Sequence, residues 1–189
     1  MPLTAALKAK VSELEEISKI VCVDFWTVEH SEDDDDVKEA VLDIAKDRLI
    51  RSEVVYAYVL IDELLSDLIA RYFFDPTKSS FELWDTEKFK YFNYHILEGM
   101  ALMRKLALVK ECNDIVKPIE VIITLTNVIR NAVAHSFFPM NKKDFKRTGT
   151  VTYKGKDIYT LEGLRLFNHD TNRAVGFLSH LLYGVPGLE

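Results

Sequence analysis

The pattern of apolar and polar positions predicts helices along most of the chain. Between Val37 and Phe74 there is no Gly or Pro, and the second half, VVYAYVLIDELLSDLIARYFF, is apolar almost all round. We therefore predict one long central helix, or two nearly collinear ones, that ends at Asp75-Pro76. Spacings of three and four place the polar residues of this stretch on one narrow helical face: Asp62, Glu63, Ser66, Asp67 and Arg71.

Three further segments have helical spacing. The first is residues 3–26. The second segment follows Asp85, which is expected to cap its helix. Gly99 inside this segment indicates a close approach of two helices. The third, residues 118–135, is rich in β-branched residues, but its length and Pro118 at its start favour a helix over a strand. The apolar stripe of the second segment is Phe89, Phe92, Ile96, Met100, Met103 and Leu106.

The C-terminal part begins differently. Residues 150–160 are typical of a short β-hairpin that turns at Lys154-Gly155. A last helix is predicted over residues 161–182, with Thr160 as its cap and Gly184 at its end. The fold class is therefore all-α: an up-and-down bundle of about five to six helices with a short β-hairpin before the last helix. We expect a single domain over residues 1–189, with a helical core at about 37–138 and the hairpin plus helix at about 148–183.

Composition supports a globular protein. The chain has 189 residues, of which 48% are hydrophobic and 29% charged, which is enough to bury a core. No apolar stretch reaches the roughly 20 residues of a membrane span, and Lys and Glu interrupt the N-terminal pattern, so no signal peptide is expected. We predict a cytoplasmic protein that does not bind membranes. Cys22, Cys112 and the five histidines have no metal-ligand spacing, so neither a metal nor a cofactor is expected.

Charge is unevenly distributed. The net charge of −6 argues against long-range attraction to nucleic acid. Glu29–Asp36 (EHSEDDDD) is strongly acidic and is predicted to be a surface loop that leads into the long helix. Basic residues gather after residue 137, so RNA would be bound locally, although an ordinary solvated loop is the alternative. The candidate contacts to an RNA backbone are Lys142, Lys143, Lys146 and Arg147.

The most chemically specific segment is Arg130-Asn131-Ala132-Val133-Ala134-His135, at the end of the third helix. On a helix Asn131 and His135 share a face, whereas Arg130 and His135 lie about 140° apart. One copy therefore cannot easily close Arg130 and His135 around a single phosphate, but two copies related by a twofold axis can. In the alternative interpretation, Arg130 and His135 only complement the negative end of the helix. The adjacent carboxylates Asp62 and Glu63 point about 100° apart, which argues against paired acid–base catalysis.

Three stretches in this order, VLIDELLSDLIARYF, HILEGMALMRKLALV and IRNAVAHSFF, resemble the HEPN superfamily over roughly residues 40–138. That family consists of helical bundles whose Arg-x4–6-His motif forms a metal-independent ribonuclease site at a dimer interface. The resemblance implies that His135 is the general acid or base and that Arg130 binds the scissile phosphate. Asn131 would orient His135 or the phosphate. It also implies a homodimer that cuts RNA in defence or stress response.

One position departs from part of that family. In the HEPN toxins paired with a nucleotidyltransferase antitoxin, a tyrosine that can be modified with AMP commonly stands two residues after the histidine. Phe137 occupies that position here and has no hydroxyl group. The same stretch is also similar to the mannitol-operon repressor family, which is helical and regulatory. That second resemblance implies a non-catalytic interaction module that works through a protein partner.

Overall fold

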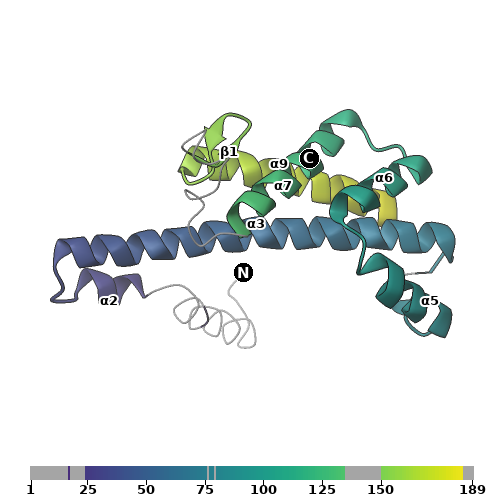
Figure 1. Cartoon of the computed structure of the whole chain (residues 1–189), viewed down its shortest axis with the longest axis horizontal. Helices are drawn as coiled ribbons and strands as arrows, with labels where there is room; N and C mark the ends of the chain where they lie inside the picture. Colours follow the sequence, from purple (N-terminus) through teal and green to yellow (C-terminus); the bar gives the residue numbers. More distant parts are fainter. Residues whose placement is uncertain (1–16, 18–23, 76, 79, 135–149, 185–189) are drawn as a thin grey trace, which may run out of the picture. The chain divides into compact units, whose positions relative to one another are not determined.

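Helices make up most of the computed structural model, which describes residues 17, 24–75, 77–78, 80–134 and 150–184 (Figure 1). The chain divides into two compact units, residues 1–52 and 53–189. The long helix α3 (Asp35–Phe73) crosses the boundary between them. Its length confirms the helix that was predicted from the stretch without Gly or Pro.

The first unit contains a short helix and the beginning of α3. Helix α2 (Phe25–Glu29) starts at Asp24, whose carboxylate accepts a hydrogen bond from the backbone N–H of Trp26 at 3.2 Å. The acidic run then forms the predicted connection, and Asp35 and Asp36 lie in the first turn of α3. Their charge is favourable there because the N-terminus of a helix is its positive end. Most of the helix predicted over residues 3–26 lies outside the described residues.

The second unit is a bundle in which α3 packs with α6 (Leu102–Cys112), α7 (Lys117–Ala134) and α9 (Leu161–Tyr183). Helix α7 confirms that the β-branched segment is helical. Burial of apolar side chains at the shared centre supplies most of the stabilisation of such a bundle. The core cluster is Ile61, Leu64, Leu65, Leu68, Ile69, Leu97, Leu102, Leu106, Val109, Ile119, Ile122, Ile123, Ala174, Leu178 and Leu182.

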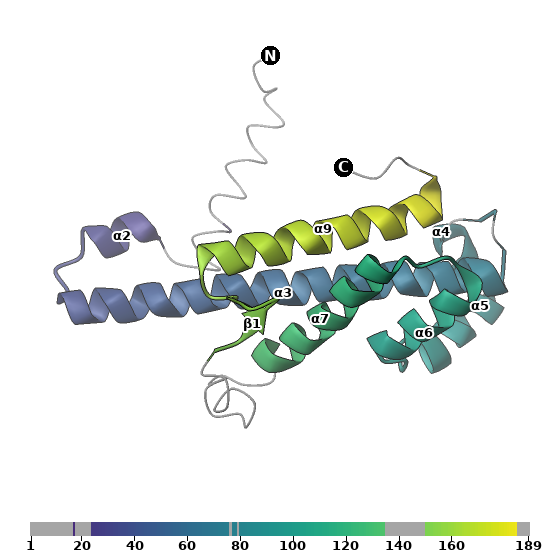
Figure 2. The same cartoon turned by 90° about the horizontal axis from the view of Figure 1, so that it is seen from above.

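Two contacts show that α9 runs parallel to the second half of α3. At one end, Asn168 Nδ2 donates to Glu53 Oε1 at 2.7 Å. At the other end, the Arg71 guanidinium donates to the backbone carbonyl of Leu182. Figure 2 shows α9 alongside α3 and α7 running in the opposite direction, with its C-terminal end towards β1. The structure therefore confirms an all-α bundle.

Between α3 and α6 the chain forms α4 (Ser80–Leu83), α5 (Glu87–Phe92) and the π-helix η1 (Asn93–Leu97). The prediction of one helix across this stripe was wrong, because the backbone N–H of Glu98 bonds five residues back to Asn93, and Ala101 is extended. The capping prediction was also wrong: Thr86, not Asp85, accepts from the N–H of Phe89, at 3.4 Å. Both residue types can cap a helix, and the extended backbone of Thr86 decides between them.

Gly99 does not lie at a close approach of two helices, so that prediction was wrong as well. It is exposed in the turn between η1 and α6, and a Cβ atom there would meet only the carbonyl oxygen of Ile96, at 3.9 Å. The glycine marks the break in the helix rather than a packing contact.

The C-terminal elements follow the prediction. Strands β1 (Thr152–Tyr153) and β2 (Lys156–Asp157) pair antiparallel, and the turn residues Lys154 and Gly155 have φ values of 48° and 80°. Two consecutive positive φ angles are what a two-residue hairpin turn of type I′ requires. Thr160 then caps α9 by accepting from the N–H of Gly163 at 3.1 Å. Gly184, at φ 64°, ends the helix.

Candidate functional site

The end of α7 carries two of the three residues of the predicted motif. The buried face of α7, including Ile129 and Val133, packs into the bundle and places Arg130 beside α3. There the guanidinium carbon of Arg130 lies 4.6 Å from the ring centroid of Tyr58. Arg130 Nη1 also donates to the side-chain oxygen of Asn131 at 3.1 Å, and Asn131 is exposed. A half-buried arginine is therefore held in one orientation next to an accessible amide.

The remaining predicted site residues lie outside the described residues, so their predictions stay untested. This applies to His135 and to Phe137, which follow directly after α7. It applies also to the candidate RNA contacts Lys142, Lys143, Lys146 and Arg147. The structure thus brings Arg130 and Asn131 together, and the prediction that His135 joins them stays untested.

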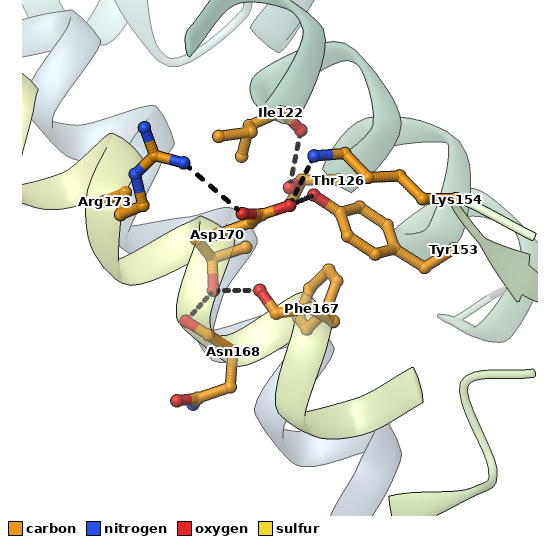
Figure 3. A network of polar contacts seen from close by, with 9 residues as sticks. Ile122, Thr126, Tyr153, Lys154, Phe167, Asn168, Asp170 and Arg173 are labelled. Carbon is orange, nitrogen blue, oxygen red and sulfur yellow. Dashed lines mark hydrogen bonds and ion pairs between the residues drawn. The ribbon is translucent and has the colours of Figure 1, made fainter. Parts of the chain in front are cut away.

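A buried carboxylate that was not predicted from the sequence joins the hairpin to α9. Asp170 is only 3% exposed. Its Oδ2 accepts from the Tyr153 hydroxyl at 3.0 Å and from Lys154 Nζ at 2.5 Å, while Arg173 Nη1 lies 3.9 Å from Oδ1. Figure 3 shows these three side chains pointing at Asp170 from the hairpin and from α9. A signal existed in the sequence: Asp170 falls between Phe167 and Ala174 on the apolar face of the predicted helix.

Burial and hydrogen bonding act in opposite directions on this carboxylate. Burial disfavours the charged form of Asp170, but the hydrogen bonds from Lys154 and Tyr153 outweigh it and lower its pKa below the ordinary value. Burial, together with the bond to Asp170, raises the pKa of the Tyr153 hydroxyl far above its usual range. Because Asp170 and Tyr153 are both buried, this network fixes the hairpin on α9.

The residues of the predicted polar face of α3 contact two neighbouring helices, α6 and α9. Asp62 Oδ2 forms an ion pair with Nζ of the buried Lys105 in α6 at 2.6 Å, whereas Arg71 points to α9. On the same face, α3 borders a pocket of about 340 Å³ that we call the acidic pocket. Its lining residues are Asp62, Glu63, Ser66, Asp67, Trp84, Phe89, Asn93, Leu97, Glu98 and Lys105.

No group of three or more His, Cys, Asp or Glu side chains within the described ranges is arranged to hold a metal ion. In the same part of the chain, no helix is long and apolar enough to cross a membrane. Comparison of the chain with protein-family models, with curated proteins and with solved structures found no match.

Proposed function

We propose that this chain is a metal-independent endoribonuclease of the HEPN type that acts as a homodimer. The position of Arg130 supports the proposal best. A guanidinium that lies 4.6 Å over the ring of Tyr58, and is bonded to Asn131, is oriented before any substrate arrives. Its planar fork of donors matches two phosphate oxygens, which a lysine could not match in the same way.

The proposed reaction needs no group beyond the RNA and the motif. The ribose 2′-oxygen attacks the neighbouring phosphorus and gives its proton to a base, while the bond from phosphorus to the 5′-oxygen breaks and that oxygen takes up a proton. His135 serves as the acid or base. Arg130 stabilises the charge that builds up on the phosphoryl oxygens, and Asn131 orients either partner. The products are a 2′,3′-cyclic phosphate and a 5′-hydroxyl.

We expect purified protein to cut single-stranded RNA in the presence of a chelator and to leave cyclic phosphate ends. Arg130→Ala should reduce the cleavage rate about a hundredfold, the usual cost of losing one donor to transition-state charge. Arg130→Lys should recover only part of the rate, because it restores the charge without the fork. His135→Ala should be at least as impaired as Arg130→Ala.

The matched control is Arg165→Ala, which removes an exposed arginine from α9 and should leave cleavage unchanged. Each variant is first compared with the wild type by thermal unfolding. Uncut RNA with the wild-type protein, or equal cutting by Arg130→Ala and His135→Ala, contradicts the ribonuclease proposal.

The outward face of α7 supports the dimer. Between Glu120 and Arg130 the helix has no charged residue, and Val121 and Val128 are 38% and 54% exposed. Val121, Leu125, Val128 and Ala132 follow at spacings of four, three and four, the pattern of a seam between two packed helices. A twofold contact through this seam would bring both copies of Arg130–Asn131 close to one interface.

A charge in this seam should separate the two copies. Light scattering should give a dimer for the wild type and a monomer for Val128→Glu, because the introduced carboxylate would be buried against its own symmetry mate. RNA cleavage should fall in parallel. Val116→Glu changes another exposed valine, just before α7, and should remain dimeric. A monomeric wild type, or a dimeric Val128→Glu, excludes this interface.

A second candidate function is a helical interaction module of the mannitol-repressor type. The observation in its favour is a set of exposed aromatic side chains on α5, η1 and the end of α3, well represented by Tyr91 at 66% and Tyr94 at 57% exposed. Exposed aromatic groups in one region are typical of protein-binding surfaces.

A further inference from the structure

The acidic pocket has a lining that suits a positively charged group. Among the described residues that line it, Asp62, Glu63, Asp67 and Glu98 contribute carboxylates and Lys105 contributes an ammonium group. That ammonium is already bonded to Asp62 at 2.6 Å. A volume of about 340 Å³ is at the lower end for small-molecule sites, and it is enough for one long side chain.

An aromatic wall connects the pocket to the outer surface. Trp84 and Phe89 line the pocket, and their ring centroids are 5.4 Å apart. From Trp84 the next ring is that of the exposed Tyr94, at 5.7 Å. In the other direction, ring contacts of 5.1 to 6.4 Å lead outwards to exposed side chains at the end of α3. The order of contacts is Phe89, Phe74, Phe92, Phe73 and Tyr72.

A further aromatic pair lies on the same elements. Tyr91 and His95, one helical turn apart, have ring centroids at 4.4 Å, and both are exposed. Together with Tyr72, Phe73 and Tyr94 they form what we call the aromatic surface. Each of these side chains is more than a third exposed, and exposed aromatic groups on neighbouring elements are typical of protein-binding surfaces.

We infer that the acidic pocket and the aromatic surface together bind a basic segment of a partner protein, with one lysine or arginine side chain inserted into the pocket. Charge complementarity selects this partner: carboxylates favour a cation, and aromatic faces attract ammonium and guanidinium groups. The chain itself already shows both contacts. Lys88 Nζ lies 5.6 Å from the ring centroid of Phe74, and Lys105 pairs with Asp62.

The same lining disfavours RNA at this surface. Aromatic side chains can stack with bases, but the carboxylates of Glu63 and Glu98 would repel the phosphate backbone. The inferred surface shares no residue with the proposed cleavage site at Arg130 and Asn131. It can be tested whether or not the protein cuts RNA.

Fluorescence anisotropy with the full chain tests the inference. The probe is a short fluorescein-labelled peptide of arginine, leucine and glycine, compared with a peptide that has glutamate in place of arginine. The arginine peptide should bind and the glutamate peptide should not. Glu63→Gln should weaken binding about fivefold, and Tyr91→Ala about tenfold, since it removes an exposed aromatic contact.

Matched controls keep the result specific to this surface. Glu111→Gln changes an exposed carboxylate elsewhere on α6, and Tyr56→Ala removes a 65% exposed tyrosine from α3; neither should change the affinity. Equal binding of the two peptides, or equal losses in test and control variants, overturns the inference. So does tighter binding of labelled poly-uridine that Tyr91→Ala weakens, because the surface would then be a site for nucleic acid.

Discussion

Replacing Asp170 with alanine should lower the free energy of unfolding by about 3 kcal/mol, because it removes a buried charged acceptor of two hydrogen bonds and leaves a buried donor unsatisfied. The substitution removes the acceptor of the Tyr153 hydroxyl, which is fully buried and has no access to water. Lys154 would lose its closest anion as well. The hairpin and α9 would then keep the ion pair of Lys156 with Glu162 at 2.7 Å and apolar contacts such as the edge-to-face pair of Tyr153 and Phe167 at 5.3 Å.

Denaturant unfolding measures the effect, with Asp114→Ala as a control at an exposed aspartate. Tyr153→Phe should cost about 1 kcal/mol in the wild type, the net value of one hydrogen bond. In the Asp170→Ala background the same change should cost less, because the hydroxyl no longer has a partner. Additive effects of the two substitutions would show that the hydroxyl and the carboxylate do not stabilise the fold through each other.

The lowered pKa of Asp170 makes the difference in unfolding free energy between the wild type and Asp170→Ala depend on pH. The folded protein lowers that pKa below 3.8, so the ionised network stabilises the fold fully above the pKa of the unfolded chain. The contribution is lost as the pH falls through the lower, folded value. The stability difference between wild type and Asp170→Ala should therefore be constant near neutral pH and shrink below about pH 4.

Gly163→Ala should also destabilise the protein, by about 2 to 3 kcal/mol, although alanine is the better helix former by about 1 kcal/mol. Gly163 is buried in the first turn of α9, directly under β2. An added Cβ would lie 2.6 Å from the carbonyl carbon of Asp157, closer still to its oxygen, and 3.2 Å from the Cα of Ile158. That carbonyl cannot move freely, because Thr160 donates to it from its N–H at 3.1 Å and from its hydroxyl at 2.7 Å.

Thermal unfolding should therefore show a lower midpoint for Gly163→Ala, by roughly 4–12 °C for a domain of this size. Arg165→Ala, at an exposed position two residues later, should shift it little. A raised midpoint for Gly163→Ala would mean that helix propensity outweighs the contact and that the hairpin does not press on α9.

The elements that were predicted correctly are those in which the local preference of the residues agrees with the packing of the whole fold. Lys154-Gly155 suits a turn with positive φ angles, and Thr160 and Gly184 suit the two ends of α9. The break around residues 97–101 could not be predicted, because apolar spacing continues across it. There the backbone of η1 changes which side chains face inwards: Leu97 is buried, whereas Ile96 is 44% exposed.

Among the candidate sites, residues that are neighbours in sequence could be predicted, whereas contacts between distant segments could not. Arg130 and Asn131 are neighbours in sequence, so a motif could single them out. The pairing of Asp62 with Lys105 joins residues 43 positions apart, and nothing in either local sequence selects the other. The position of Asp170 among apolar residues was visible as an anomaly, but the hairpin side chains that satisfy it could be found only from the fold.

The parallel arrangement of α3 and α9 affects the order in which the chain can fold. Arg71 and its acceptor at Leu182 are 111 residues apart, and α9 follows every other described element. On the ribosome, the side of α3 that contacts α9 stays uncovered until the last helix emerges. Closure of the core by such distant segments is slow, and the incomplete chain exposes apolar groups that favour aggregation or binding to a chaperone.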